Sequence, residues 1–208
     1  MKLISSLVVL LLLSLHVSGQ EFKKMSDAAK CKTAIQKKQN TIKSLTADFK
    51  ETVYSEMFDD AQKATGKLSY KKSNKIRWEH TSPTKKILLI DGSKVKYSEN
   101  GKEVKNPTSK AVVKKIQDLM VKMLSGSFLD GKDFAITYYE NTTQYKLVLK
   151  PNSERLSKYI ESIVLYFDKK DCLLKEMSLV ESEDEKIVYT FSNAQVNPTI
   201  NDTKFTSF

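Results

Sequence analysis

The chain is poor in the side chains that carry out catalysis. Its only histidines are His16 and His80, and His16 lies in an apolar N-terminal segment, so a Ser-His-Asp triad or a multi-histidine metal site has little to draw on. The sequence has no Gly-x-Ser-x-Gly elbow, no Cys-x-x-Cys pair and no phosphate-binding glycine loop. We therefore predict no catalytic residue, no metal site and no cofactor, and we interpret His80 as a surface residue at a strand end. Paired carboxylates for glycoside hydrolysis stay open, because their separation depends on the fold.

The charged side chains argue against a nucleic-acid partner, and the two cysteines leave a disulfide open. The formal net charge is +10, yet Arg77 and Arg155 are the only arginines. Nucleic-acid recognition favours the planar arginine fork, so we expect no nucleic-acid partner and a lysine surface that mainly keeps the protein soluble. Cys31 and Cys172 are the only cysteines. They either form a bridge in an oxidising compartment or fill small apolar spaces.

The N-terminus has the features of an export signal. A positive start at Lys2 precedes an apolar run over residues 3–17, and Val17-Ser18-Gly19 places small residues before Gln20. This pattern predicts a signal peptide over residues 1–19, cleaved after Gly19, and one domain over residues 20–208. A retained N-terminal anchor is the alternative. No cysteine follows the cleavage site directly, so we do not expect the protein itself to be a lipoprotein.

The sequence predicts a helix first and then a series of β-hairpins, and these elements must position any functional site. Residues 26–45 are amphipathic, with Ser26 as the expected cap. From Thr46 the apolar period is two, which indicates strands, and Asp91-Gly92 and Asn100-Gly101 are typical hairpin turns. A second amphipathic helix is expected over residues 109–125, with Gly126 as its stop.

Strand patterning resumes after this second helix and continues to the C-terminus. About ten or eleven strands in successive hairpins favour one antiparallel sheet, and so many strands must curl. The predicted fold class is therefore mainly β with helices (α+β). We expect a single curved antiparallel sheet of about 11 strands that forms a half-open barrel capped by helices.

An ordered set of segments carries a resemblance to a known family. The segments, in chain order, are Leu45-Thr46-Ala47-Asp48-Phe49, Gly66-Lys67-Leu68, Ile76-Arg77-Trp78, Pro83, and Ile87-Leu88-Leu89-Ile90-Asp91-Gly92. The C-terminal half agrees in strand rhythm and in an ending with Asn197 followed by Phe205. This pattern resembles the periplasmic outer-membrane lipoprotein carrier family, the LolA type.

The resemblance implies a cargo, a cavity and a lid. The cargo is the acyl portion of lipoproteins, taken from an inner-membrane ABC transporter complex and passed through the periplasm to an outer-membrane acceptor by a monomeric carrier. The side chains that would line the lipid-binding cavity are Phe49, Leu68, Ile76, Trp78, Leu88 and Ile90. Those that would form part of the lid on the second helix are Val112, Ile116, Met120 and Met123, although the default role of such residues is ordinary core.

One position departs from the family pattern. The family often has an Arg-Pro pair whose arginine holds the lid shut, and this chain has Lys72 followed by Ser73 there. A lysine keeps the charge but lacks the multidentate donor set, so Lys72 is the expected lid contact and the closure is expected to be weaker. Two other functions stay open: an envelope sensor or chaperone of the same fold that binds lipid or misfolded envelope protein, and an envelope enzyme with polar groups converging in the cavity.

Overall fold

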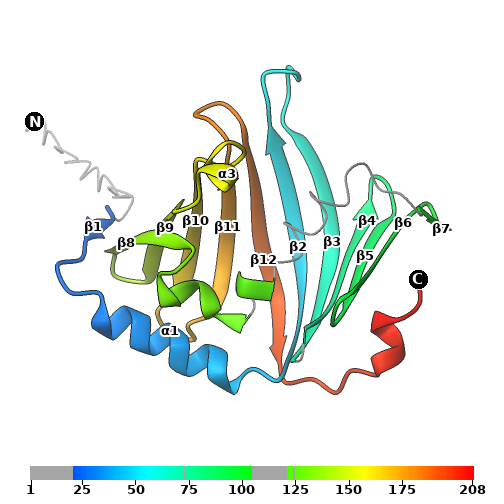
Figure 1. The fold of residues 1–208 in the computed structure, drawn as a ribbon, viewed down its shortest axis with the longest axis horizontal. Coiled ribbons are helices and arrows are strands. Elements are labelled where there is room, and N and C mark those ends of the chain that lie inside the picture. Colours follow the sequence, from blue (N-terminus) through cyan, green and yellow to red (C-terminus); the bar gives the residue numbers. More distant parts are fainter. Residues whose placement is uncertain (1–20, 73, 105–120, 124) are drawn as a thin grey trace, which may run out of the picture.

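The computed structural model describes residues 21–72, 74–104, 121–123 and 125–208. These residues build one sheet of twelve strands, in the order β1-β8-β9-β10-β11-β12-β2-β3-β4-β5-β6-β7 (Figure 1). The strands are β1 (Lys23–Lys24), β2 (Ser44–Tyr54), β3 (Gln62–Lys71), β4 (Lys75–Ser82), β5 (Lys86–Asp91), β6 (Lys94–Glu99), β7 (Lys102–Glu103), β8 (Phe134–Glu140), β9 (Gln144–Pro151), β10 (Ser162–Asp168), β11 (Leu174–Val180) and β12 (Lys186–Val196). The helical elements with described bounds are α1 (Ala29–Thr41), η1 (Ser127–Asp130), α3 (Glu154–Ser157) and η2 (Asp202–Phe205), and residues 121–123 and 125 are also helical.

The predicted fold class is confirmed. Every neighbouring pair of strands is antiparallel, and the sheet curls around a concave face with α1 across one end (Figure 1). Two meanders, β2–β7 and β8–β12, meet where β12 pairs with β2. The sheet exceeds the expected eleven strands because β1 and β7 are two-residue strands, too short for an alternating pattern to reveal.

The first helix is shorter than its sequence pattern predicts. It spans Ala29–Thr41, and Leu45 belongs to β2. Ser26 as the cap is wrong, because the N-cap position is Ala28 and no side chain caps the helix there. The Asp27 carboxylate accepts a hydrogen bond from the Ala29 N–H at 2.8 Å just before the first turn. The buried face of the helix carries Cys31 and Ile35, and these two side chains dock it on the sheet.

Asn197 fastens the end of α1 to the sheet. Its Oδ1 accepts a hydrogen bond from the Lys43 N–H at 2.7 Å, and its Nδ2 donates to the Thr41 carbonyl at 3.0 Å. The residue has a φ of 59°, a conformation that asparagine tolerates better than most residues. The side chain thus joins the start of β2 to the residue that follows β12.

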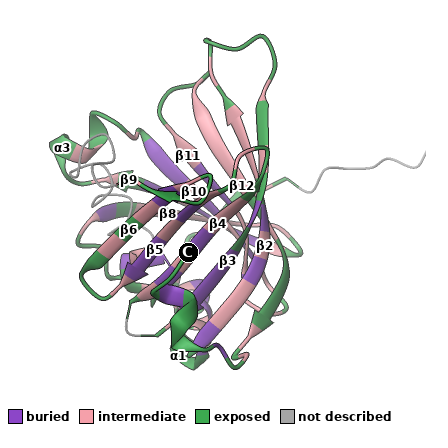
Figure 2. Cartoon of the chain, turned by 90° about the vertical axis from the view of Figure 1, so that its right-hand side faces the viewer, coloured by how far each residue is buried: buried purple, intermediate pink, exposed green. Residues whose placement is uncertain are grey.

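The concave face holds two apolar clusters. The first, here called the β8–β11 cluster, includes Leu147, Leu165 and Phe167 from the sheet, with Ile35 of α1 and Phe128 of η1. The second, here called the β2–β5 cluster, consists of Ile42, Phe49, Leu68, Tyr70, Ile76, Trp78, Ile90 and Leu173. Tyr189 and Phe191 of β12 pack against both clusters. Figure 2 shows the buried positions recurring along the strands, as a period of two requires.

The C-terminal segment covers part of the opposite, convex face. Phe205 of η2 is buried, as are Ile87 and Leu89, which alternate with the concave residues of β5. The Arg77 guanidinium donates hydrogen bonds to the carbonyls of Lys204 at 3.2 Å and Ser207 at 2.7 Å. These contacts hold the segment against β4 and β5.

Two further features follow from the described part of the chain. Cys31 and Cys172 are free thiols and do not form a disulfide in the structure. Burial is the main cause that raises the pKa of the Cys31 thiol to about 12. Among the described residues, no helix is both long enough and apolar enough to cross a membrane.

Candidate functional site

The six side chains predicted to line a cavity lie together on the concave face. Cross-strand register explains this, because directly opposed residues in neighbouring antiparallel strands share a face. Leu68 is opposite Trp78, Trp78 is opposite Leu88, and Ile76 is opposite Ile90. Phe49 lies on β2 and is buried with them, whereas Leu88 is only partly buried at the border of the β2–β5 cluster. Their role in binding a ligand stays a prediction.

Aromatic rings form the centre of this surface. The rings of Phe49 and Trp78 are stacked, with centroids 4.4 Å apart and an interplanar angle of 27°. Tyr189 meets Trp78 edge-on at 5.1 Å, and Phe191 meets it edge-on at 6.2 Å. Such offset and edge-to-face pairs stabilise beyond the area they bury, so these rings stabilise the packing of β2, β4 and β12 against one another.

Gly66 makes room for the Phe49 ring. The two residues are opposite each other in register, and a Cβ at Gly66 would lie 2.2 Å from Cζ of Phe49 and 2.2 Å from the carbonyl oxygen of Glu79. No side chain fits in that space without moving backbone. The Gly66-Lys67-Leu68 segment noticed in the sequence therefore has a steric reason for its glycine.

A polar group lies next to these rings, and it corrects the interpretation of His80. His80 is part of β4 and partly buried, and its Nε2 is 3.0 Å from Oε2 of Glu51. Burial disfavours the charged form of Glu51, but hydrogen bonds from His80 and Tyr189 outweigh that cost and lower the pKa of the carboxyl. Burial, with the nearby Glu51 charge, raises the pKa of Tyr189 far above its usual range. An ionised carboxylate only accepts, so His80 and Tyr189 donate.

Strand parity could have revealed this group. Glu51 is two residues from Phe49, His80 is two residues from Trp78, and Tyr189 is two residues from Phe191, so each polar residue faces the same side as an aromatic one. The sequence interpretation missed the group because β2 and β4 are separated by β3 and β12 arrives from the far end of the chain.

Most of the predicted lid lies outside the described residues. This applies to Val112, Ile116 and Met120, whereas Met123 is described and is buried in the β8–β11 cluster. Its neighbour Val121 packs against the β2–β5 cluster. The described end of this segment therefore contacts both halves of the concave face.

Lys72 lies in the turn between β3 and β4 with an exposed side chain. Its backbone N–H donates to the Lys43 carbonyl at 2.7 Å, so the turn is tied to the segment between α1 and β2. The structure places Lys72 at the α1 end of the concave face, and its contact with a lid stays a prediction.

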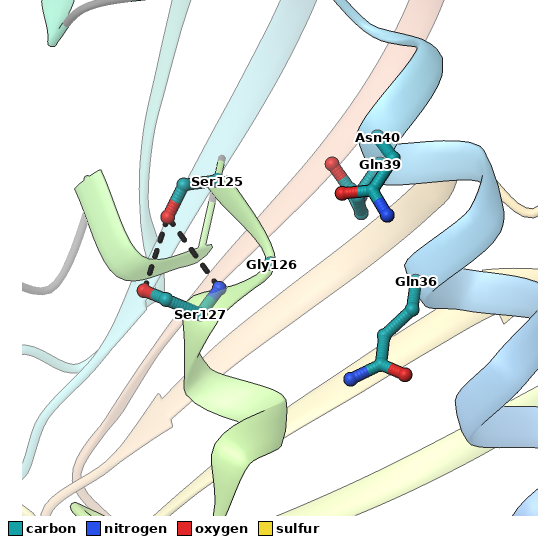
Figure 3. A pocket seen from close by; sticks show the side chains of 6 residues that line it. All are labelled: Gln36, Gln39, Asn40, Ser125, Gly126 and Ser127. Carbon is teal, nitrogen blue, oxygen red and sulfur yellow. Dashed lines mark hydrogen bonds between the residues drawn. The ribbon is translucent and has the colours of Figure 1, made fainter.

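A polar pocket of about 360 Å³ lies between α1 and the segment before η1 (Figure 3). Its lining residues are Gln36, Gln39, Asn40, Ser125, Gly126 and Ser127. These side chains carry amides and hydroxyls and no charge, and Ser125 and Ser127 already hydrogen-bond to each other at 3.0 Å. An acyl chain gains nothing from such a lining, so this pocket does not compete with the apolar surface. No group of three or more potential metal ligands occurs among the described residues.

Comparison with known proteins agrees with this geometry. The family model described as "Outer membrane lipoprotein carrier protein LolA" matches residues 40–207. The chain belongs to the LolA family. The match begins at the end of α1 and includes every strand that contributes to the β2–β5 cluster.

Relatives with curated names are similar at modest identity. An outer-membrane lipoprotein carrier protein of Coxiella burnetii (strain RSA 331 / Henzerling II) is 27% identical over 167 residues, covering 80% of this chain and 77% of the relative. One from Nitrosomonas europaea is 25% identical over 162 residues, covering 76% of each. Among solved structures, an uncharacterized conserved protein of Thermus thermophilus has a TM-score of 0.52 and 9% identity, covering 88% of this chain and 94% of that one. This last similarity shows the fold alone.

Proposed function

We propose that this protein carries lipoproteins by taking their acyl chains onto the concave face of β2–β5. The observation that supports the proposal best is the set of six apolar side chains on that face, in a chain of the lipoprotein carrier family. Residues 1–19 act as the export signal, cleaved after Gly19, and residues 20–208 work as one monomeric domain in the periplasm.

The energetics suit a carrier. Moving an acyl chain out of water gains about 0.8 kcal/mol per methylene, so one long chain gains roughly 10 kcal/mol before any cost of opening the site. In the structure the β2–β5 cluster is already covered, with Ile76 and Ile90 fully buried. Displacing that cover offsets part of the gain, which keeps the bound cargo releasable.

We propose that the segment ending at Met123 forms part of this cover. Val121 contacts the β2–β5 cluster, which supports a lid that extends back through Met120, Ile116 and Val112. Methionine is flexible and polarizable, and it repacks around chains of different shape. Lys72 lies at the edge of the same face and is the proposed lid contact.

The route follows from the family. The donor is an inner-membrane ABC transporter complex, and the acceptor lies at the outer membrane. The Glu51–His80–Tyr189 group supports a structural and not a catalytic role, because the carboxylate binds both of its neighbours. We propose that the protein is not an enzyme.

Trp78 provides the test. It is the only tryptophan and lies within the proposed site, so its fluorescence reports occupancy directly. Titration of the mature protein with a synthetic diacylated lipopeptide should change the emission saturably, and the same peptide without acyl chains should not. Leu88→Glu should weaken acyl binding by at least a hundredfold, because it places a carboxylate among methylenes.

The matched control is Val164→Glu. Val164 is also partly buried, but it lies on β10 next to the concave Leu165, so it faces the convex side. This variant should bind the lipopeptide within twofold of the wild type. Normal binding by folded Leu88→Glu protein would refute the assignment of the site.

A further inference from the structure

The hairpin between β2 and β3 exposes large apolar side chains. Tyr54 is 42% exposed, Met57 is 82% exposed and Phe58 is 48% exposed. They make up three of the five exposed large hydrophobic residues in the described part of the chain, the others being Tyr159 and Phe208. Such a concentration at one place typically marks a contact surface.

The backbone of this turn is ordered by its own hydrogen bonds. The Phe58 N–H donates to the Ser55 carbonyl at 3.1 Å, and the Met57 N–H meets Oγ of Ser55 at 3.3 Å. These hydrogen bonds define the backbone of the turn that presents the exposed side chains.

Acidic residues surround the exposed side chains. Residues 55–61 contain three acids, Glu56, Asp59 and Asp60, and no base. The turn between β11 and β12, residues 181–185, contains four acids and no base. In a chain with a net charge of +10, this is a local reversal of sign.

The two turns form one surface. Tyr54 is opposite Lys186 in the β2–β12 pairing, and Oγ of Ser55 donates to Oε1 of Glu185 at 3.3 Å. Both hairpins project from the sheet at the end away from α1 (Figure 1). We name residues 54–61 together with residues 181–185 the acidic tip.

We propose that the acidic tip docks a protein partner whose contact face is basic and holds an apolar pocket. Met57 and Phe58 fill the pocket, and the surrounding carboxylates pair with the basic rim. An anionic membrane is disfavoured, because the acids that flank Met57 and Phe58 are repelled by its surface. The docking is separate from acyl binding, since the tip lies beyond the β2–β5 cluster.

Site-specific photocrosslinking in the cells that produce the protein tests this proposal first. p-Benzoylphenylalanine replaces Met57 in one variant and Phe208 in the control, which is exposed at the C-terminus. The Met57 variant should give a protein adduct that the control lacks. No specific adduct, an adduct with lipid, or an adduct with a second copy of this chain would overturn the proposal.

Affinity measurements with the purified crosslinked partner then decide between docking and chance proximity. Met57→Ser/Phe58→Ser and Asp59→Lys/Asp60→Lys should each weaken binding at least tenfold, and salt should weaken binding by the wild type. The control Phe208→Ser should leave the affinity unchanged, and all variants should bind diacylated lipopeptide as the wild type does. Unchanged affinity in both tip variants would overturn the docking site, whereas failure of the wild type to bind lipopeptide would refute the carrier function instead.

Discussion

The two apolar clusters of the concave face lie on one sheet and share an alternating pattern. They differ in which other elements of the chain contribute buried side chains to them. The β8–β11 cluster is filled by the chain itself, with Cys31 and Ile35 of α1 and Phe128 and Leu129 of η1 among its buried members. The β2–β5 cluster contains no buried residue from either element, and Leu88, Val95 and Val121 lie only partly buried at its border.

We relate this difference to the stability of the fold and to the proposed binding of acyl chains. The β8–β11 cluster is completed by buried residues of α1 and η1, so we propose it as the folding core. The β2–β5 cluster is bordered by partly buried side chains such as Leu88 and Val121, and we propose that acyl chains replace part of its cover. Tyr189 and Phe191 join the two halves, so the core holds the proposed binding surface in shape.

The largest expected effect comes from truncating the folding core. Phe167 is fully buried, and its ring lies parallel to that of Phe128 with centroids 6.4 Å apart. Phe167→Ala should lower the free energy of unfolding by about 3–5 kcal/mol, measured by urea denaturation. The folded variant should still bind diacylated lipopeptide, and loss of less than about 1 kcal/mol would break the distinction between the halves.

Gly66→Ala should be nearly as damaging, although it adds only one methyl group. That carbon would lie 2.2 Å from the Glu79 carbonyl oxygen and from the Phe49 ring, and overpacking of this kind costs about 1–3 kcal/mol or more. Thermal denaturation measures the loss. Adding Phe49→Leu should recover part of it, since the ring contact is relieved and the backbone contact remains. Full stability of Gly66→Ala would contradict the close packing of β2 on β3.

Leu88→Ala should lower the affinity for lipopeptide more than it lowers the stability of the fold. Because Leu88 is only partly buried at the border of the β2–β5 cluster, its truncation should lower stability by about 1 kcal/mol. Affinity for the lipopeptide should fall roughly tenfold, which corresponds to about 1.4 kcal/mol. Trp78 fluorescence titration and urea denaturation on the same sample measure both. A loss of stability without a loss of affinity would place Leu88 in the folding core.

The smallest effect concerns Glu51 and pH. Its pKa is lowered in the folded protein from its ordinary value of 4.5, so ionised Glu51 stabilises the fold above about pH 4.5, and this contribution is lost as the pH falls through the folded pKa. The stability difference between wild type and Glu51→Gln should shrink as the pH falls below about 4.5. A difference independent of pH down to pH 3 would contradict the hydrogen bonds from His80 and Tyr189.

Much of the fold is predictable from local pattern, and the site only in part. Alternation indicated the strands that carry Leu68 and Trp78, whereas the resemblance to the family grouped these residues with Leu88. Asn100-Gly101 marked its turn correctly, with positive φ at both residues. The start of α1 was wrong at Ser26 because the helix begins at Ala29 and its N-cap, Ala28, makes no side-chain capping hydrogen bond. His80 was misplaced because its partner Glu51 is 29 residues away on a strand that is not its neighbour. Contacts across three strands depend on register, which no single segment encodes.

We propose that this protein recognises the acyl chains of its lipoprotein cargo and not the polypeptide of that cargo. Native mass spectrometry of the mature protein with an acylated lipoprotein, and with the same lipoprotein stripped of its acyl chains, tests it most directly. The account predicts a one-to-one complex with the acylated form alone. Equal binding of both forms, or of neither, would contradict the claim and favour a sensor or chaperone built on the same sheet.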